Sequence, residues 1–207
     1  MNIITISREF GSGGRELGMQ LAQLMNYDYY DSEIITAVAS QSGLEPSYVK
    51  EALGKHSWKS HPLTCRRTLA SASYTAQSPQ ISLLLKQKDV IEGIAALGRD
   101  CLIVGRNADV ILANEKPFNL FVCASREAKL QRCQKRAPQG ENLTEKELLR
   151  KMKQIDRVRS QTRELMTGSP WGLRDNYHLT VNTTGWNITE LAPAVADFAA
   201  LWFGRDV

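Results

Sequence analysis

The sequence has 207 residues, of which 43% are hydrophobic and 23% charged, proportions typical of a globular protein and too apolar for a disordered chain. No apolar run approaches the ~20 residues that a membrane helix requires, and the first residues lack the basic and apolar regions of a secretory signal. The net charge of +4 is unevenly distributed: twelve basic and five acidic residues lie between Arg126 and Arg163, which suits a phosphate-rich ligand.

The first predicted elements form a strand, a glycine-rich turn and a helix. Residues 3–6 are apolar, Gly11-Ser12-Gly13-Gly14 follows, and three leucines then recur at helical spacing. Such a turn attracts anions, because exposed backbone N–H groups and the helix dipole point at one spot. A dinucleotide-binding loop would need a third glycine where Glu16 stands, so the pattern favours a loop that wraps around phosphates. A glycine turn without a ligand is the alternative.

The remaining elements alternate between apolar strands and helices. In chain order they are a strand at 27–30, helices at 33–42 and 81–97, strands at 101–104 and 118–123, a basic helical segment at 126–163 that is broken at 167–170, a strand at 178–181 and a helix at 188–203. Residues 43–78 are polar and poorly patterned. This order predicts one α/β domain over 1–207, with a parallel sheet of about five strands flanked by helices.

Several motifs resemble those of the cytidylate kinase-like proteins. Residues 4–17, ITISREFGSGGREL, resemble the opening of that family. The similarity continues in the same order at residues 29–35, 103–109, 156–159, 171–172 and 179–183. The resemblance implies a P-loop NTPase fold with a basic helical lid over 126–170 and a small helical region over 33–98 that binds a nucleoside monophosphate. It also implies ATP and Mg²⁺ as cofactors, and transfer of the γ-phosphoryl group to a small acceptor such as CMP.

The glycine loop departs from the P-loop pattern at its lysine. Gly14 holds the lysine position, and Arg15 and Glu16 follow it. The resemblance implies that ATP phosphates bind at Gly11, Ser12, Gly13, Gly14, Arg15 and Glu16. We expect Arg15 to supply the missing cation, with Arg8 as the second candidate, and Glu16 to bind Mg²⁺ through its carboxylate. On this view a lysine at position 14 would compensate for part of the loss of Arg15. Alternatively, Arg15 and Glu16 face solvent in the first turn of a helix.

Two polar residues follow predicted strands, where ligands bind in parallel sheets. Asp31 resembles the acidic residue that contacts the acceptor nucleotide, although Asp31-Ser32 also suits a helix N-cap. The planar fork of Arg106 could hold the acceptor phosphate, or it could form a buried ion pair with Asp109.

The basic segment resembles the lid of these kinases, whose arginines stabilise the migrating phosphoryl group. We expect catalytic roles for Arg157 and Arg159 together with Arg15 and Arg106, and lid contacts from Arg132, Arg136 and Arg163. Most lysines of the segment are expected to be solvated.

The four scattered cysteines form no metal-ligand or CxxC pattern, which predicts reduced thiols and a cytoplasmic location. Nucleotides are the expected partners, with a homo-oligomer possible through 43–78. Two other functions stay open: a nucleotide-binding or regulatory protein that lost activity with its lysine, and nucleic-acid binding through the basic segment. The second ranks last, because the segment has no recognisable reading motif and the glycine loop would be unexplained.

Overall fold

A computed structural model describes residues 1–54, 79–136 and 143–204 of the chain. Its centre is a sheet of five parallel strands in the order β2-β3-β1-β4-β5. The strands are β1 (Ile3–Arg8), β2 (Asp28–Tyr30), β3 (Cys101–Val104), β4 (Phe118–Cys123) and β5 (Leu179–Asn182). The predicted parallel sheet is therefore confirmed.

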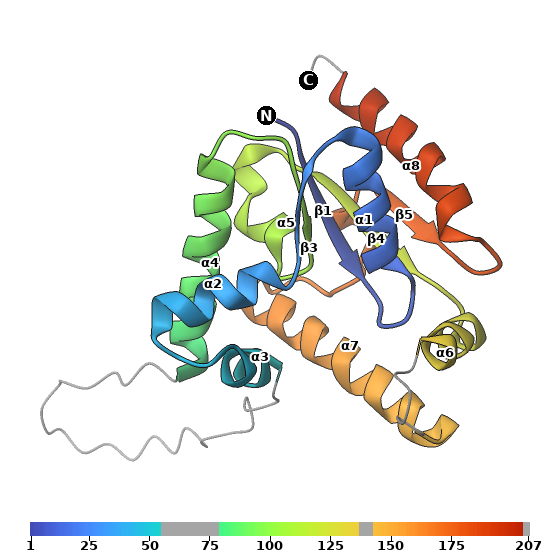
Figure 1. The fold of residues 1–207 in the computed structure, drawn as a ribbon, viewed down its shortest axis with the longest axis horizontal. Coiled ribbons are helices and arrows are strands. Elements are labelled where there is room, and N and C mark those ends of the chain that lie inside the picture. Colours follow the sequence, from blue (N-terminus) through green and yellow to red (C-terminus); the bar gives the residue numbers. More distant parts are fainter. Residues whose placement is uncertain (55–78, 137–142, 205–207) are drawn as a thin grey trace, which may run out of the picture.

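Helices cover both faces of the sheet (Figure 1). They are α1 (Gly14–Met25), α2 (Glu33–Ser42), α3 (Pro46–Gly54), α4 (Pro79–Ala96), α5 (Ala108–Ile111), α6 (Arg126–Lys135), α7 (Glu145–Thr167) and α8 (Ile188–Phe203), with short 3-10 turns at Ala113–Glu115 and Arg174–Asn176. None of the helices in the described ranges combines the length and apolar character needed to cross a membrane.

The alternating side chains of β1 divide the core into two layers, because successive residues of a strand point to opposite faces. Ile4 and Ile6 pack in a cluster with α1 and α8, whereas Ile3 packs in a second cluster with α2, α4 and α5. These three isoleucines and β3 are almost fully buried. The strands that carry the site are therefore held from both sides.

Two stretches differ from the sequence expectations. Residues 46–54, within the poorly patterned stretch, form α3, while 55–78 lie outside the described residues. The basic segment is two helices, α6 and α7, rather than one, and residues 137–142 between them are outside the described ranges. The α7 helix begins at a capping box in which the Thr144 hydroxyl and the Glu147 carboxylate each accept a backbone N–H, and it ends at Gly168.

Candidate functional site

A cavity of about 1160 Å³ lies at the edge of the sheet where the strands end. Ligand pockets usually measure about 300–1,000 Å³, so this one has room for two small substrates. Its described lining contains eight basic residues and two acidic ones, Glu9 and Asp31. The basic residues are Arg8, Arg15, Lys50, Arg106, Arg132, Arg136, Lys151 and Arg159. The cavity is therefore built for an anionic ligand.

The glycine loop between β1 and α1 forms one wall of the cavity. Gly11 and Gly13 have φ angles of 78° and 84°, which residues with a Cβ adopt only with strain. A Cβ at Gly13 would also lie 2.8 Å from Ile188 Cδ1. The first bond of α1 is donated by the Leu17 N–H to the Gly13 carbonyl, so the preceding N–H groups have no partner within the helix. This arrangement presents backbone donors to an anion.

Side chains of α7 hold the start of the loop in place. The Arg159 guanidinium donates to the Arg8 carbonyl at 2.8 Å and to the Asp156 carboxylate at 2.9 Å. That carboxylate also accepts the Phe10 N–H at 2.7 Å. Asp156 and Arg159 therefore fix the backbone on both sides of Glu9. Arg157, between them in sequence, is exposed and does not line the cavity, so the structure gives it no contact with the site.

Basic side chains of α6 contact the other side of the loop. Arg132 donates to the Gly11 carbonyl at 2.8 Å, and the Lys129 ammonium pairs with the Glu9 carboxylate at 2.8 Å. Arg136 pairs with the carboxylate of Glu16 in the first turn of α1. Arg132 and Arg136 thus reach the glycine loop and its helix.

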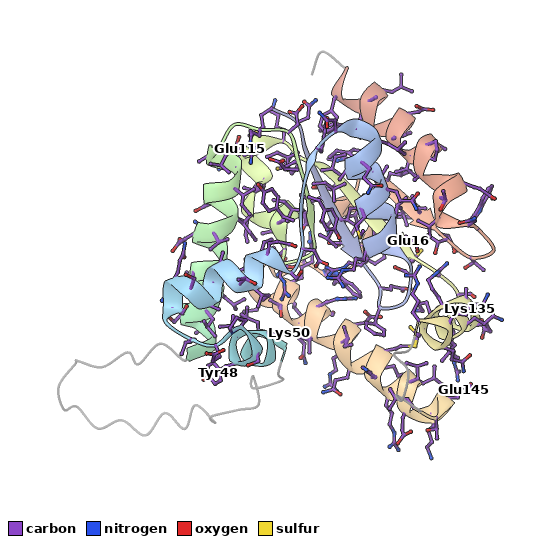
Figure 2. All side chains as sticks on the ribbon, viewed as in Figure 1. Glu16, Tyr48, Lys50, Glu115, Lys135 and Glu145 are labelled. Atoms are coloured by element: carbon purple, nitrogen blue, oxygen red, sulfur yellow. The ribbon has the colours of Figure 1, made fainter. Side chains whose placement is uncertain are left out.

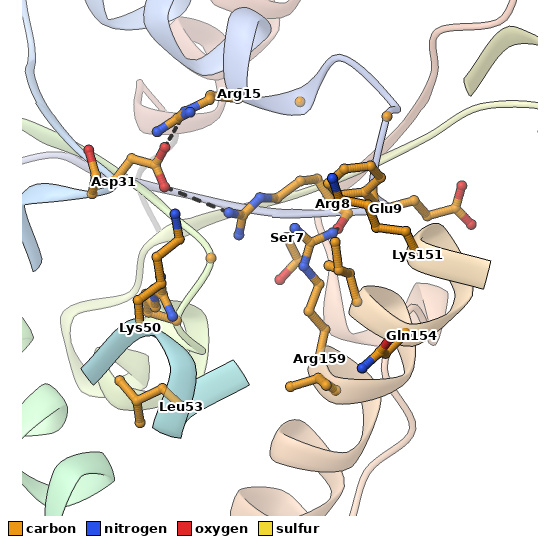
Figure 3. Close-up of a pocket in the computed structure, with 18 of the residues that line it drawn as sticks. Ser7, Arg8, Glu9, Arg15, Asp31, Lys50, Leu53, Lys151, Gln154 and Arg159 are labelled. Carbon is orange, nitrogen blue, oxygen red and sulfur yellow. Dashed lines mark hydrogen bonds and ion pairs between the residues drawn. The ribbon is translucent and has the colours of Figure 1, made fainter. Parts of the chain in front are cut away.

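Arg8, the last residue of β1, extends into the cavity beneath the glycine loop (Figure 3). Its side chain is 17% exposed, and its Nη2 atom lies 3.7 Å from an Asp31 carboxylate oxygen. Burial, together with the nearby positive charge of Arg159, lowers the pKa of Arg8 to about 9. Holding the charged Arg8 side chain here costs free energy, because it is buried with too little counter-charge. A bound anion would reduce that cost, so the position favours an anion.

Arg106 enters the cavity from a turn at the end of β3. Gly105, Arg106 and Asn107 have φ angles of 76°, 59° and 54°, and two of these residues carry a Cβ. Consecutive left-handed residues are strained, and strain of this kind clusters at functional sites. The Gln87 amide secures the turn by donating to the Arg106 carbonyl at 3.1 Å. Burial lowers the pKa of Arg106, and its buried Nε has no hydrogen-bond partner among the described residues.

Asp31 follows β2 and faces two arginines of the site. Its carboxylate pairs with Arg8 and with Arg15 (Figure 3). The N-cap of α2 is Ser32, and no side chain makes a capping bond there. The N-cap position of the Asp31-Ser32 pair therefore falls on Ser32, and Asp31 faces the arginines instead. Lys50 of α3 points toward the same carboxylate in Figure 3.

Arg15 lines the cavity, whereas Glu16 does not. The Arg15 side chain is 63% exposed and is paired with Asp31. The Glu16 carboxylate pairs with Arg136, and Glu16 does not line the cavity. In Figure 2, Glu16 lies on α1 and Lys50 on α3, on opposite sides of the strand ends. The structure thus gives no support to Glu16 as a magnesium ligand. The described residues contain no cluster of three or more His, Cys, Asp or Glu that could hold a metal.

Arg163 and Asp109 form a buried ion pair beneath the site. Both side chains are at most 5% exposed, and the guanidinium also lies 5.5 Å from the centre of the Tyr177 ring. Arg163 is therefore not among the residues that line the cavity, which corrects its grouping with the lid arginines. Asp109 is taken by Arg163, so it is not the partner proposed for Arg106.

Sequence reasoning gave Arg8 second place and missed Asp156 as a support of the loop. The signal for Arg8 was its position at the end of the first strand, at the same edge as Asp31 and Arg106. The residues that surround Arg8 could not be read from the sequence, because the strand order β2-β3-β1 brings together the ends of three strands that are distant along the chain.

Comparisons with known proteins agree with this architecture. An uncharacterized protein from Eubacterium ventriosum superposes with a TM-score of 0.70 at 22% identity, over 99% of this chain and 100% of its own. Shikimate kinase from Bacteroides thetaiotaomicron superposes with a TM-score of 0.56 at 11% identity, over 96% and 98%. Shikimate kinase from Acinetobacter baumannii, in complex with shikimate, gives 0.54 at 13% identity, over 99% and 96%. A comparison with curated proteins gave no match.

These likenesses identify the fold as the P-loop NTPase fold of such kinases. A model of the cytidylate kinase-like family matches residues 3–185, which is most of the sequence. The chain therefore belongs to the cytidylate kinase-like family.

Proposed function

We propose that this protein transfers the γ-phosphoryl group of ATP to a nucleoside monophosphate such as CMP. The kinase-like family and fold support a phosphotransferase. The observation that carries the proposal is the convergence of Arg8, Arg106 and Arg159 on one cavity beside the glycine loop. Phosphoryl transfer needs this arrangement, because catalysis rests on positioning and on stabilising the charge of the migrating group.

In the proposed reaction, an oxygen of the acceptor phosphate attacks the γ-phosphorus of ATP. The new oxygen–phosphorus bond forms as the bond from the γ-phosphorus to the bridging oxygen breaks, which yields ADP and a nucleoside diphosphate. The glycine loop binds the ATP phosphates, while Arg106 holds the acceptor phosphate and Asp31 contacts the acceptor. Arg159 keeps the loop in position. Mg²⁺, bound through phosphates and water, supplies charge neutralisation when present.

The proposed reaction belongs in the cytoplasm. Cys101, Cys123 and Cys133 are free thiols, a state that a reducing compartment preserves. Cys65 lies outside the described residues.

A coupled assay of ADP release, with Mg²⁺ and a panel of monophosphates, tests the proposal. We expect turnover with at least one pyrimidine or purine monophosphate, and the diphosphate product identified by ³¹P NMR. Shikimate belongs in the panel as a hydroxyl acceptor, because shikimate kinases share the fold. Arg99→Ala is the control, because Arg99 is an exposed arginine paired with Asp28 away from the cavity.

ATP binding without turnover on any acceptor would instead favour a nucleotide-binding protein without transfer activity, the reading to which Gly14 in the lysine position points. If the protein neither binds ATP nor turns it over, both functions are contradicted.

A further inference from the structure

Arg8 and Gly14 occupy two defined positions of the P-loop pattern. In G-x-x-x-x-G-K, the first glycine and the lysine are six residues apart. Aligned on Gly13, this chain has Arg8 at the position of the first glycine and Gly14 at that of the lysine. The cation and the glycine have therefore exchanged places, with the spacing of the loop unchanged.

The structure shows a physical reason for the exchange. A Cβ built on Gly14 would lie 2.7 Å from Arg8 Cβ and 3.1 Å from Arg8 Cγ. Real Cβ atoms do not approach each other so closely, so position 14 cannot carry a side chain while Arg8 keeps its present path. Only one of the two positions can send a long side chain into this space.

Gly105 makes room for the other end of Arg8. A Cβ at Gly105 would overlap Arg8 Nη1 and would lie 2.8 Å from Cζ. Gly14 thus lies beside the Cβ and Cγ atoms of Arg8, and Gly105 lies beside its guanidinium. The contact at Gly14 is the more demanding of the two, because it involves the Cβ and Cγ atoms of Arg8 rather than the flexible end of its side chain.

The surroundings of Arg8 fit a cation that meets phosphate. Arg106 and Arg159 add positive charge, and Asp31 is the carboxylate that Arg8 faces, at 3.7 Å. Arg15, by contrast, is 63% exposed. Arg8 is the better-placed cation, since its guanidinium is already held inside the cavity.

We propose that Arg8 is the catalytic cation of this P-loop. Its guanidinium contacts the β- and γ-phosphates of ATP in place of the lysine, and Gly14 stays without a side chain so that Arg8 can reach them. The inference rests on the proposed function. It also means that a lysine at position 14 will not compensate for the loss of Arg15, because Arg8 blocks that position.

Four variants test the exchange: Arg8→Ala, Gly14→Lys, the double variant Arg8→Gly with Gly14→Lys, and Arg15→Ala. Arg8→Ala should lower kcat by about 10²-fold or more, the scale for one preorganised electrostatic group. It should also raise the Kd for Mg²⁺-ATP about tenfold, whereas Arg15→Ala should do less on both measures. Gly14→Lys should lose activity by overlap with Arg8. The double variant restores G-x-x-x-x-G-K and should be more active than both Gly14→Lys and Arg8→Ala.

Circular dichroism and urea unfolding show which variants are folded, and calorimetric titration with Mg²⁺-ATP gives a readout besides turnover. If Arg8→Ala keeps wild-type kcat and ATP affinity, this inference is wrong while the proposed function stands. A folded double variant that is no more active than Gly14→Lys would also overturn it. If Gly14→Lys does not fold, the comparison of the double variant with Arg8→Ala decides. A wild type that neither binds nor turns over ATP would refute the proposed function and this inference with it.

Discussion

At the residue scale, the site contains more positively charged side chains than negatively charged ones to balance them. Asp31 pairs with Arg8 and Arg15, but the Nε of Arg106 has no partner among the described residues. Burial lowers the pKa of both Arg106 and Arg159. A buried arginine with donors to spare is poised for a phosphate, which can accept two parallel bonds from its fork.

Arg106 gives the residue-scale prediction. Arg106→Lys should raise the KM for the acceptor or lower kcat, because an ammonium cannot reproduce a bidentate fork. The Kd for ATP should stay within about twofold of the wild type, because the glycine loop is untouched. Steady-state kinetics and ATP titration measure the two effects separately. Weaker ATP binding or loss of folding would show that Arg106 has a structural role.

At the element scale, α7 ties the cavity to the rest of the fold. Its second half is bound to the glycine loop through Asp156 and Arg159, and to α5 through Arg163 and Asp109. Its first half packs Leu148 and Met152 against Leu130 of α6. The second half of α7 is thus a fixed wall of the cavity.

The anchoring of α7 can be tested at Asp109. Asp109→Ala should lower the free energy of unfolding by about 3–5 kcal/mol, since Arg163 would stay buried without its counter-ion. Urea unfolding measures the loss. Replacing both partners, Asp109→Leu with Arg163→Met, should recover much of it.

The matched control is Glu92→Ala, which breaks the Lys88–Glu92 pair on the surface of α4. Both of its side chains are about half exposed, so solvent screens the pair, and its loss should cost far less stability than the loss of the buried pair. An equal effect of the two single variants would mean that the buried pair does not anchor α7.

At the scale of the whole molecule, positive charge is concentrated at the edge of the sheet. The cavity lining holds eight basic and two acidic side chains among the described residues. Like charges held together lower the stability of the folded state, and a bound anion relieves that cost.

Phosphate-bearing ligands should therefore stabilise the whole domain. At about 100 times its Kd, ATP should add roughly 2.7 kcal/mol to the free energy of unfolding. Inorganic phosphate should raise the Tm as well, and both shifts should shrink at high salt, which screens charges. Thermal unfolding with adenosine, the same base without phosphates, is the control. An equal shift from adenosine and ATP would argue against a phosphate site.

Local patterns were enough to predict much of the fold. The apolar run 101–104 and the helix 188–203 were predicted with the bounds that the structure shows, because their periodicity and their flanking residues lie within the segment itself. The glycine loop was found for the same reason. The division of the basic segment into α6 and α7 was missed, because charged residues favour a helix on both sides of the break.

The roles of single arginines depended on the tertiary structure. From sequence, Arg15 was the natural substitute for lysine, since it follows the glycines directly. The strand order put Arg8 beside Gly14, Gly105 and Asp31, which are up to 97 residues away in sequence. Arg163 was predicted to be a lid residue, but it forms a buried ion pair because Asp109 of α5 lies beside it. Backbone elements follow from short-range pattern, whereas burial and charge partners are set by contacts that only the folded chain brings together.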